Sequence, residues 1–125
     1  MSSITPEVTS TAAAFYASWP TTMGKLKAAA PEIGRAFGPY FQGLMKEGAL
    51  SVKHKELIAL ALGVAARCDF CVYTHVEKCL KAGATAEEIM DATGVAVMMG
   101  GGPSYTFATV VSGALEHLTS QAQPV

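Results

Sequence analysis

Three side chains that can carry thiol chemistry lie close together between positions 68 and 75. Cys68 and Cys71 form a Cys-x-x-Cys pair, and His75 follows four residues later. Each residue of a helix turns about 100°, so neighbouring members of this set lie about 60° and about 40° apart, on one face. The thiolate is the nucleophilic form of cysteine, and a histidine one turn away can accept the thiol proton. The spacing therefore predicts a redox-active pair with its own base.

Two features decide which sulfur attacks, and they favour different cysteines. The predicted helix terminus, with its free N–H groups and the cation of Arg67 nearby, favours a thiolate at Cys68. The base favours Cys71, because His75 is one turn away from it. We predict Cys71 as the nucleophile and Cys68 as the partner that resolves the oxidised sulfur as a disulfide.

Glu56 is the predicted third member of the site. If two helices form an antiparallel hairpin that turns at Arg67, a rise of 1.5 Å per residue places Glu56 about 16 Å and His75 about 12 Å from the turn. The two levels differ by about 4 Å, which is within reach of side chains or of one water. Glu56 would then orient His75, which deprotonates Cys71, as in a catalytic triad. Lys78 lies at a matching height and is the alternative partner for Glu56.

A metal site is the main chemical alternative at these positions. Cys68, Cys71, His75 and Cys79 offer soft ligands, but eleven residues of helix separate Cys68 from Cys79 by about 16 Å. The ligands of one zinc ion all lie within about 2.3 Å of it. We therefore expect no metal and no cofactor, and we interpret Cys79 as a small buried apolar residue.

The hairpin that must position these residues consists of two predicted helices. Ser51 can cap the first, which runs from Val52 to about Ala66. Its second half is apolar on every face, which predicts a central helix that is covered on all sides. The second helix runs from about Cys68 to Ala82, and Gly83 ends it.

Further helices are predicted around the hairpin from caps and from glycine or proline stops. They cover residues 5–19, 31–48, 85–100 and 103–118, with a short helix or turn over 23–30. Pro20 is expected to stop the first, and Gly38-Pro39 to kink or split the second. No run favours strands. We predict an all-α, single-domain bundle (residues 1–125) of about six to seven helices with a central helical hairpin, a core over about 31–118 and a flexible tail over 119–125.

Composition excludes several classes of protein. The chain has 125 residues and 13.0 kDa, enough for one domain. A formal net charge of −1 argues against nucleic-acid binding. The longest apolar stretch, over residues 57–66, is too short to span a membrane, and no signal peptide is expected, so we predict a cytoplasmic protein with reduced thiols.

Hydropathy predicts self-association. Half of the residues are hydrophobic, only 15% are charged, and the mean hydropathy is +0.31. A monomer of this size buries about two-thirds of its unfolded surface. Part of the apolar surface is therefore expected to be buried between subunits.

The spacing of Glu56, Cys68, Cys71 and His75 resembles the core motif of the alkylhydroperoxidase D family, within the carboxymuconolactone decarboxylase superfamily. The pattern G-A-T-A-E-E-I, from Gly83 to Ile89, is similar as well. The resemblance covers roughly residues 31–118. It implies an all-α fold that assembles into homotrimers or homohexamers.

The resemblance also implies a peroxiredoxin-like thiol peroxidase that reduces organic or hydrogen peroxides. Cys71 would become a sulfenic acid, and Cys68 would close the disulfide. A dithiol reductant, such as a lipoyl protein or a thioredoxin-like partner, would reopen it. Glu56 and His75 would serve as the proton relay.

One position departs from this pattern, and two other functions stay open. The best-known members carry a second histidine where this chain has Phe70, so part of their relay is missing here. One alternative is decarboxylation or isomerisation of a small lactone, with His75 and Glu56 as acid and base. The other is a non-catalytic oligomeric or metal-binding module.

Overall fold

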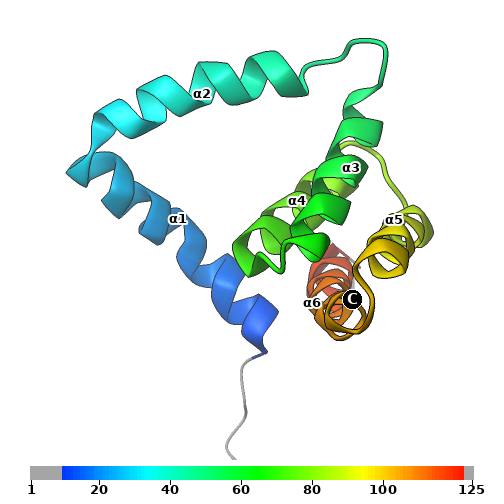
Figure 1. The fold of residues 1–125 in the computed structure, drawn as a ribbon. Helices are drawn as coiled ribbons and strands as arrows, with labels where there is room; N and C mark the ends of the chain where they lie inside the picture. The colour runs from blue at the N-terminus through cyan, green and yellow to red at the C-terminus, as the bar shows by residue number, and fades with distance from the viewer. Residues whose placement is uncertain (1–9, 123–125) are drawn as a thin grey trace, which may run out of the picture.

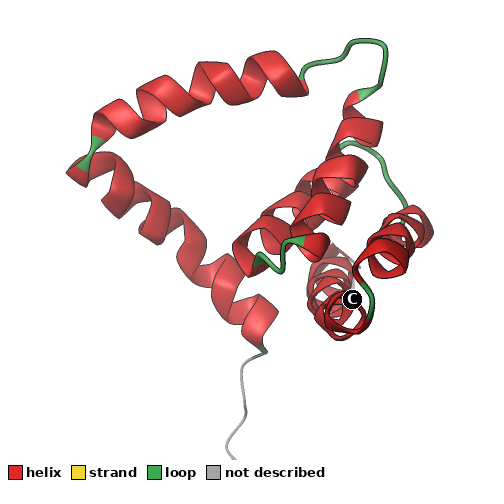
Figure 2. Ribbon diagram, in the orientation of Figure 1, coloured by secondary structure: helices red, strands yellow, loops and turns green. Residues whose placement is uncertain are grey.

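Six α-helices make up the described part of the chain, residues 10–122 of a computed structural model, and no strand occurs there (Figure 2). The prediction of an all-α fold is confirmed. The helices are α1 (Thr11–Ala29), α2 (Pro31–Met45), α3 (Val52–Ala65), α4 (Asp69–Lys81), α5 (Ala86–Gly100) and α6 (Gly102–Ala122). None of the described helices is both long and apolar enough to cross a membrane.

The bundle is built around the hairpin of α3 and α4, with α5 and α6 packed beside it (Figure 1). The first half of α1 joins this bundle, whereas α2 runs across the top of Figure 1, away from α6. Burial of branched apolar side chains is the main favourable term in such packing. The largest apolar side chains that are fully buried are Leu60, Val64, Val72, Val76, Ile89 and Val111.

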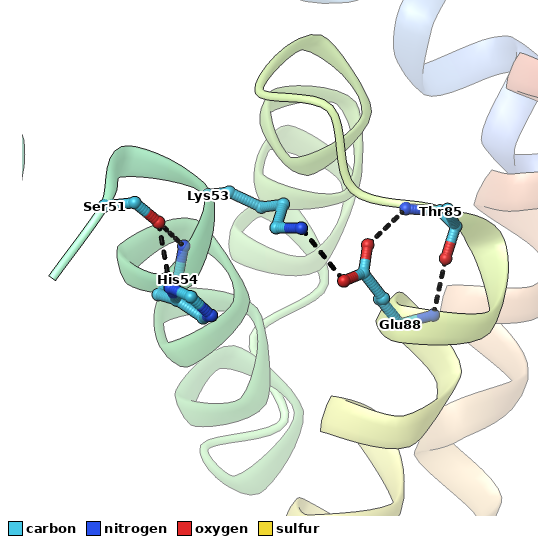
Figure 3. Close-up of polar contacts among 5 residues, drawn as sticks. All are labelled: Ser51, Lys53, His54, Thr85 and Glu88. Carbon is cyan, nitrogen blue, oxygen red and sulfur yellow. Dashed lines mark hydrogen bonds and ion pairs between the residues drawn. The ribbon is translucent and has the colours of Figure 1, made fainter.

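Local capping explains where the central helices begin and end. The Ser51 side chain accepts the N–H of His54 at 3.1 Å and so caps α3 (Figure 3). Thr85 and Glu88 form a capping box at the start of α5, with hydrogen bonds of 3.0 and 2.9 Å. Nζ of Lys53 on α3 lies 3.0 Å from Oε2 of Glu88, which ties α3 to the start of α5 (Figure 3). Gly83, at φ 94°, ends α4 as expected.

The predicted stop at Pro20 is wrong. Helix α1 continues through Pro20 to Ala29 and includes the segment expected to form a separate turn. Likewise, α2 continues through Pro39 and is not split. A proline lacks the N–H that would bond the carbonyl four residues before it, here that of Tyr16, so α1 loses one main-chain hydrogen bond at Pro20 and nevertheless continues. The predicted start at Thr5 lies outside the described residues. Within them, Ser10 caps the observed helix.

Two other boundaries differ from the prediction. Helix α2 ends at Met45 rather than near Gly48, and α6 extends to Ala122, into the segment predicted as a tail. A helix can continue through polar residues that pack against nothing, so composition alone predicts the last residue of a helix poorly.

The prediction that the helix over 52–66 is covered on all sides is wrong, because one face of α3 is exposed. Leu60 and Val64 are fully buried, but Ile58 and Leu62 are 48% and 64% exposed. Helices α4 and α5 cover two faces of α3, and nothing in the described chain covers the third.

Candidate functional site

The two cysteines lie at the turn between α3 and α4. Arg67 adopts a left-handed conformation at φ 54°, which reverses the chain. The N–H of Cys68 then bonds the carbonyl of Gly63 at 2.9 Å, which closes the end of α3. Cys68 is the N-terminal capping residue of α4, and Cys71 lies in its first turn. A disulfide joins the two, with a Cα–Cα distance of 5.2 Å.

The Cys68 sulfur occupies the electropositive end of α4. Its Sγ accepts the N–H of Cys71 at 3.2 Å, in the role that a serine or aspartate side chain plays at other helix starts. Free N–H groups and the helix dipole stabilise negative charge there. The arrangement therefore favours a thiolate at Cys68 once the disulfide is reduced. Both cysteines are half-buried, so small reactants can reach them.

Gly63 allows the cysteine turn to pack closely against α3. A Cβ at position 63 would lie 3.1 Å from the Cβ of Cys71. This role was not recognised from the sequence. The available signal was a glycine inside an apolar helix, which often marks a close approach of backbones.

Glu56 and His75 form the predicted contact across the hairpin. Oε1 of Glu56 lies 2.6 Å from Nδ1 of His75, and the two side chains are 6% and 16% exposed. A buried carboxylate requires such a partner. With Nδ1–H donating to the carboxylate, Nε2 of His75 is left free to accept a proton. The alternative partner, Lys78, instead lies over the ring of Phe41, with Nζ 4.2 Å from its centroid.

No hydrogen bond joins the His75 ring to either sulfur within residues 10–122. In a disulfide neither sulfur carries a proton, so the relay has no proton to transfer in this state. The step from Cys71 to His75 therefore stays a prediction, as do the catalytic roles of all four residues.

Phe41 of α2 reaches the site from a different part of the chain. Its ring stacks on the His75 ring with centroids 6.4 Å apart and planes inclined by 26°. Sequence reasoning missed this contact, because counting residues from the turn relates the two arms of the hairpin only, and α2 lies outside it.

Phe70 belongs to an aromatic group with side chains of α1. Phe70, which lies between the two cysteines in sequence, is 55% exposed. Its ring lies 5.8 Å from that of Phe15 and 5.6 Å from that of Trp19, both on α1. The position at which the resemblance would place a second histidine is therefore part of an apolar surface, and its phenylalanine cannot transfer protons.

Cys79 lies outside this chemistry. Its side chain is fully buried, as predicted, and burial, followed by the nearby charge of Glu56, raises the pKa of its thiol to about 12. Among the residues that the structure describes, no group of three or more His, Cys, Asp or Glu side chains is arranged to hold a metal ion.

A family model and a solved structure both match this chain over most of its length. The family model described as the carboxymuconolactone decarboxylase family matches residues 31–111. A crystal structure of a carboxymuconolactone decarboxylase family protein from Legionella pneumophila is 38% identical, with a TM-score of 0.79 over 85% of this chain and 95% of that chain.

Two further relatives are similar over most of their own length. A family protein from Thermotoga maritima, for which a part in the antioxidative response has been suggested, is 32% identical, with a TM-score of 0.67 over 70% of this chain and 91% of that chain. An uncharacterized protein of Cupriavidus necator is 38% identical over 67% of this chain and 87% of its own.

Proposed function

Because the chain belongs to the carboxymuconolactone decarboxylase family, we propose that it is a thiol-dependent peroxidase of the alkylhydroperoxidase type. The observation that carries the proposal is a Cys68–Cys71 disulfide at a helix start, one turn from a histidine whose Nδ1 lies 2.6 Å from a buried carboxylate. The suggested antioxidative role of the Thermotoga maritima relative agrees with it.

The proposed reaction begins with the reduced pair. His75 takes the thiol proton of Cys71, and the thiolate attacks the terminal oxygen of a hydroperoxide. The S–O bond forms, the O–O bond breaks, and the departing alkoxide takes the proton back from His75 and leaves as an alcohol. Cys71 is then a sulfenic acid.

Cys68 completes the oxidative half of the cycle. Its thiolate attacks the sulfur of the Cys71 sulfenic acid, the disulfide forms, and the hydroxyl group leaves as water after protonation. The hydrogen bond from the Cys71 N–H to the Cys68 sulfur supports this assignment, because it stabilises the thiolate needed for the second step.

A dithiol closes the cycle. A lipoyl protein or a thioredoxin-like partner would attack the disulfide, pass through a mixed disulfide and leave oxidised, so that two electrons reach the enzyme for each peroxide reduced. The half-buried sulfurs beside the exposed Phe70 ring give such a partner access. The proposal includes a cytoplasmic location, since reducing compartments supply these dithiols.

Self-association belongs to the same proposal, since proteins of this family commonly form oligomers. We propose a homotrimer or homohexamer. Most of the large apolar side chains that are exposed in the single chain lie on three helices, and their burial would supply the driving force. They include Ile33, Phe37, Tyr40 and Leu44 of α2, Ile58 and Leu62 of α3, and Val95, Met98 and Met99 of α5.

Peroxide consumption with a defined reductant tests the proposal. Cumene hydroperoxide loss is followed with dihydrolipoamide as electron donor, for the wild type and for Cys71→Ser. We expect turnover that needs both reactants and that disappears in Cys71→Ser. Cys79→Ala is the matched control, because it removes a buried thiol outside the site. A wild-type rate in Cys71→Ser would contradict the assigned nucleophile.

The family name and the Glu56–His75 pair favour one second candidate, acid–base chemistry on a small lactone. That reaction uses a proton donor and acceptor but no thiol. A double variant, Cys68→Ser with Cys71→Ser, separates the two. Lactone turnover that survives it would support the second candidate, whereas peroxide turnover would be lost.

A further inference from the structure

Phe41 differs from the other large apolar side chains of α2. Ile33, Phe37, Tyr40 and Leu44 are 55–64% exposed, and no residue of α2 is fully buried. Phe41 is half-buried, because its side chain turns toward α4. It is thus the aromatic contact between α2 and the candidate site.

The ring of Phe41 contacts two side chains of α4 that lie one turn apart. It stacks on the imidazole of His75, with the two ring centroids 6.4 Å apart. The Nζ atom of Lys78 lies 4.2 Å from the centroid of the Phe41 ring. A cation above an aromatic face is attracted by the ring quadrupole. Lys78 therefore helps to hold Phe41 in place beside His75.

His75 needs support that Glu56 alone does not supply. The hydrogen bond at Nδ1 holds one edge of the imidazole, but a ring held at one edge can still tilt about that bond. Packing against the face of the ring limits this tilt, and an apolar ring also keeps water from one side of the buried pair.

We infer that Phe41 is a positioning residue that holds the His75 imidazole in the orientation needed to take and return the Cys71 proton. The inference rests on the proposed peroxidase function and adds a residue from a helix outside the hairpin. The contacts of Phe41 with α4 are with His75 and Lys78, so its proposed effect passes through His75.

The test compares kcat and KM for cumene hydroperoxide in Phe41→Ala, His75→Gln and the double variant, with saturating dihydrolipoamide. A positioned base raises the rate of the chemical step by about 10²- to 10⁴-fold. We expect Phe41→Ala to lose part of this gain, with a kcat roughly tenfold below that of the wild type. KM should stay near the wild-type value. Phe41→Ala should lower kcat no further once His75 is already Gln, because a residue that acts through His75 has nothing left to position.

Three companion variants separate positioning from folding. Phe41→Tyr keeps the ring and should restore kcat, and Phe41→Leu, which keeps apolar volume without the ring, should give an intermediate value. Gln42→Ala, the adjacent exposed residue of α2, is the control and should match the wild type, with helical content checked by circular dichroism.

Two results would overturn the inference while the proposed function stands: an unchanged kcat in Phe41→Ala, or an equal loss in the wild-type and His75→Gln backgrounds. An unchanged rate in His75→Gln itself would instead contradict the proton relay of the proposed function.

Discussion

Oε1 of Glu56 lies 2.6 Å from Nδ1 of His75, although the residues are nineteen positions apart and belong to different helices. The contact joins the two arms of the hairpin one turn beyond the disulfide. It commits the Nδ1 edge of the imidazole to the carboxylate and leaves the Nε2 edge free to accept a proton.

Replacing Glu56 by Gln should therefore lower peroxide turnover. The amide nitrogen of glutamine would donate to Nδ1 and favour the tautomer with the proton on Nε2, which cannot act as a base. We expect kcat to fall by roughly 10²-fold, within the range for a lost general base. Glu87→Gln, on the exposed surface of α5, is the matched control. Equal rates in both variants would remove Glu56 from the relay.

Replacing Cys68 by Ser should trap the oxidised intermediate at Cys71. Without its resolving partner the sulfenic acid persists, so dimedone should add one label per chain after treatment with one equivalent of peroxide. Peptide mass spectrometry locates the label. A label at Cys68 in the Cys71→Ser protein, with none at Cys71 in Cys68→Ser, would reverse the assigned roles.

Cys79 should stay unreactive in the folded protein. Burial raises the pKa of its thiol from 9.0 to about 12, so it remains protonated and covered at pH 8. Iodoacetamide should label it in urea but not in buffer, as measured by intact mass.

The same shift has a consequence for stability in alkaline solution. Because the folded-state pKa is the higher one, the unfolded chain loses this proton first as the pH rises. The free energy of unfolding of the oxidised protein should therefore fall between about pH 9 and about pH 12. Cys79→Ala should show a smaller fall over that range, measured by urea titration. Parallel curves would contradict the shift.

Gly63→Ala should destabilise the protein despite the better helix propensity of alanine. The added Cβ meets the Cβ of Cys71 at 3.1 Å, and the disulfide prevents that neighbour from moving away. We expect a loss of about 1–3 kcal/mol, typical of overpacking. Gly24→Ala on α1, where nothing lies within 4 Å, should instead gain about 0.5–1 kcal/mol. Thermal unfolding of both variants provides the comparison.

Leu62→Glu should weaken self-association. The side chain is 64% exposed on α3 in the single chain, and a buried unpaired carboxylate at an interface would cost several kcal/mol. Sedimentation analysis should show smaller species than the wild type. Gln42→Glu introduces the same charge on α2 as a control. An unchanged size in Leu62→Glu would place the interface elsewhere.

Much of the helical framework was predictable because its causes are local. Ser51, Gly83 and Thr85 mark helix ends through hydrogen bonds or backbone angles within a few residues. Pro20 misled for the opposite reason. Its local cost is real, but α1 continues through it to Ala29, so the local rule alone did not place this helix end.

The candidate site divides in the same way. Helical rise and rotation are constant along the chain, so spacing was enough to predict that Cys68, Cys71 and His75 share the start of one helix and that Glu56 comes level with His75. The stacking of Phe41 on His75, and the close approach of the backbone at Gly63 to Cys71, could be seen only in the folded structure. These contacts depend on how closely and at what angle the helices pack, which is set by all of their side chains together.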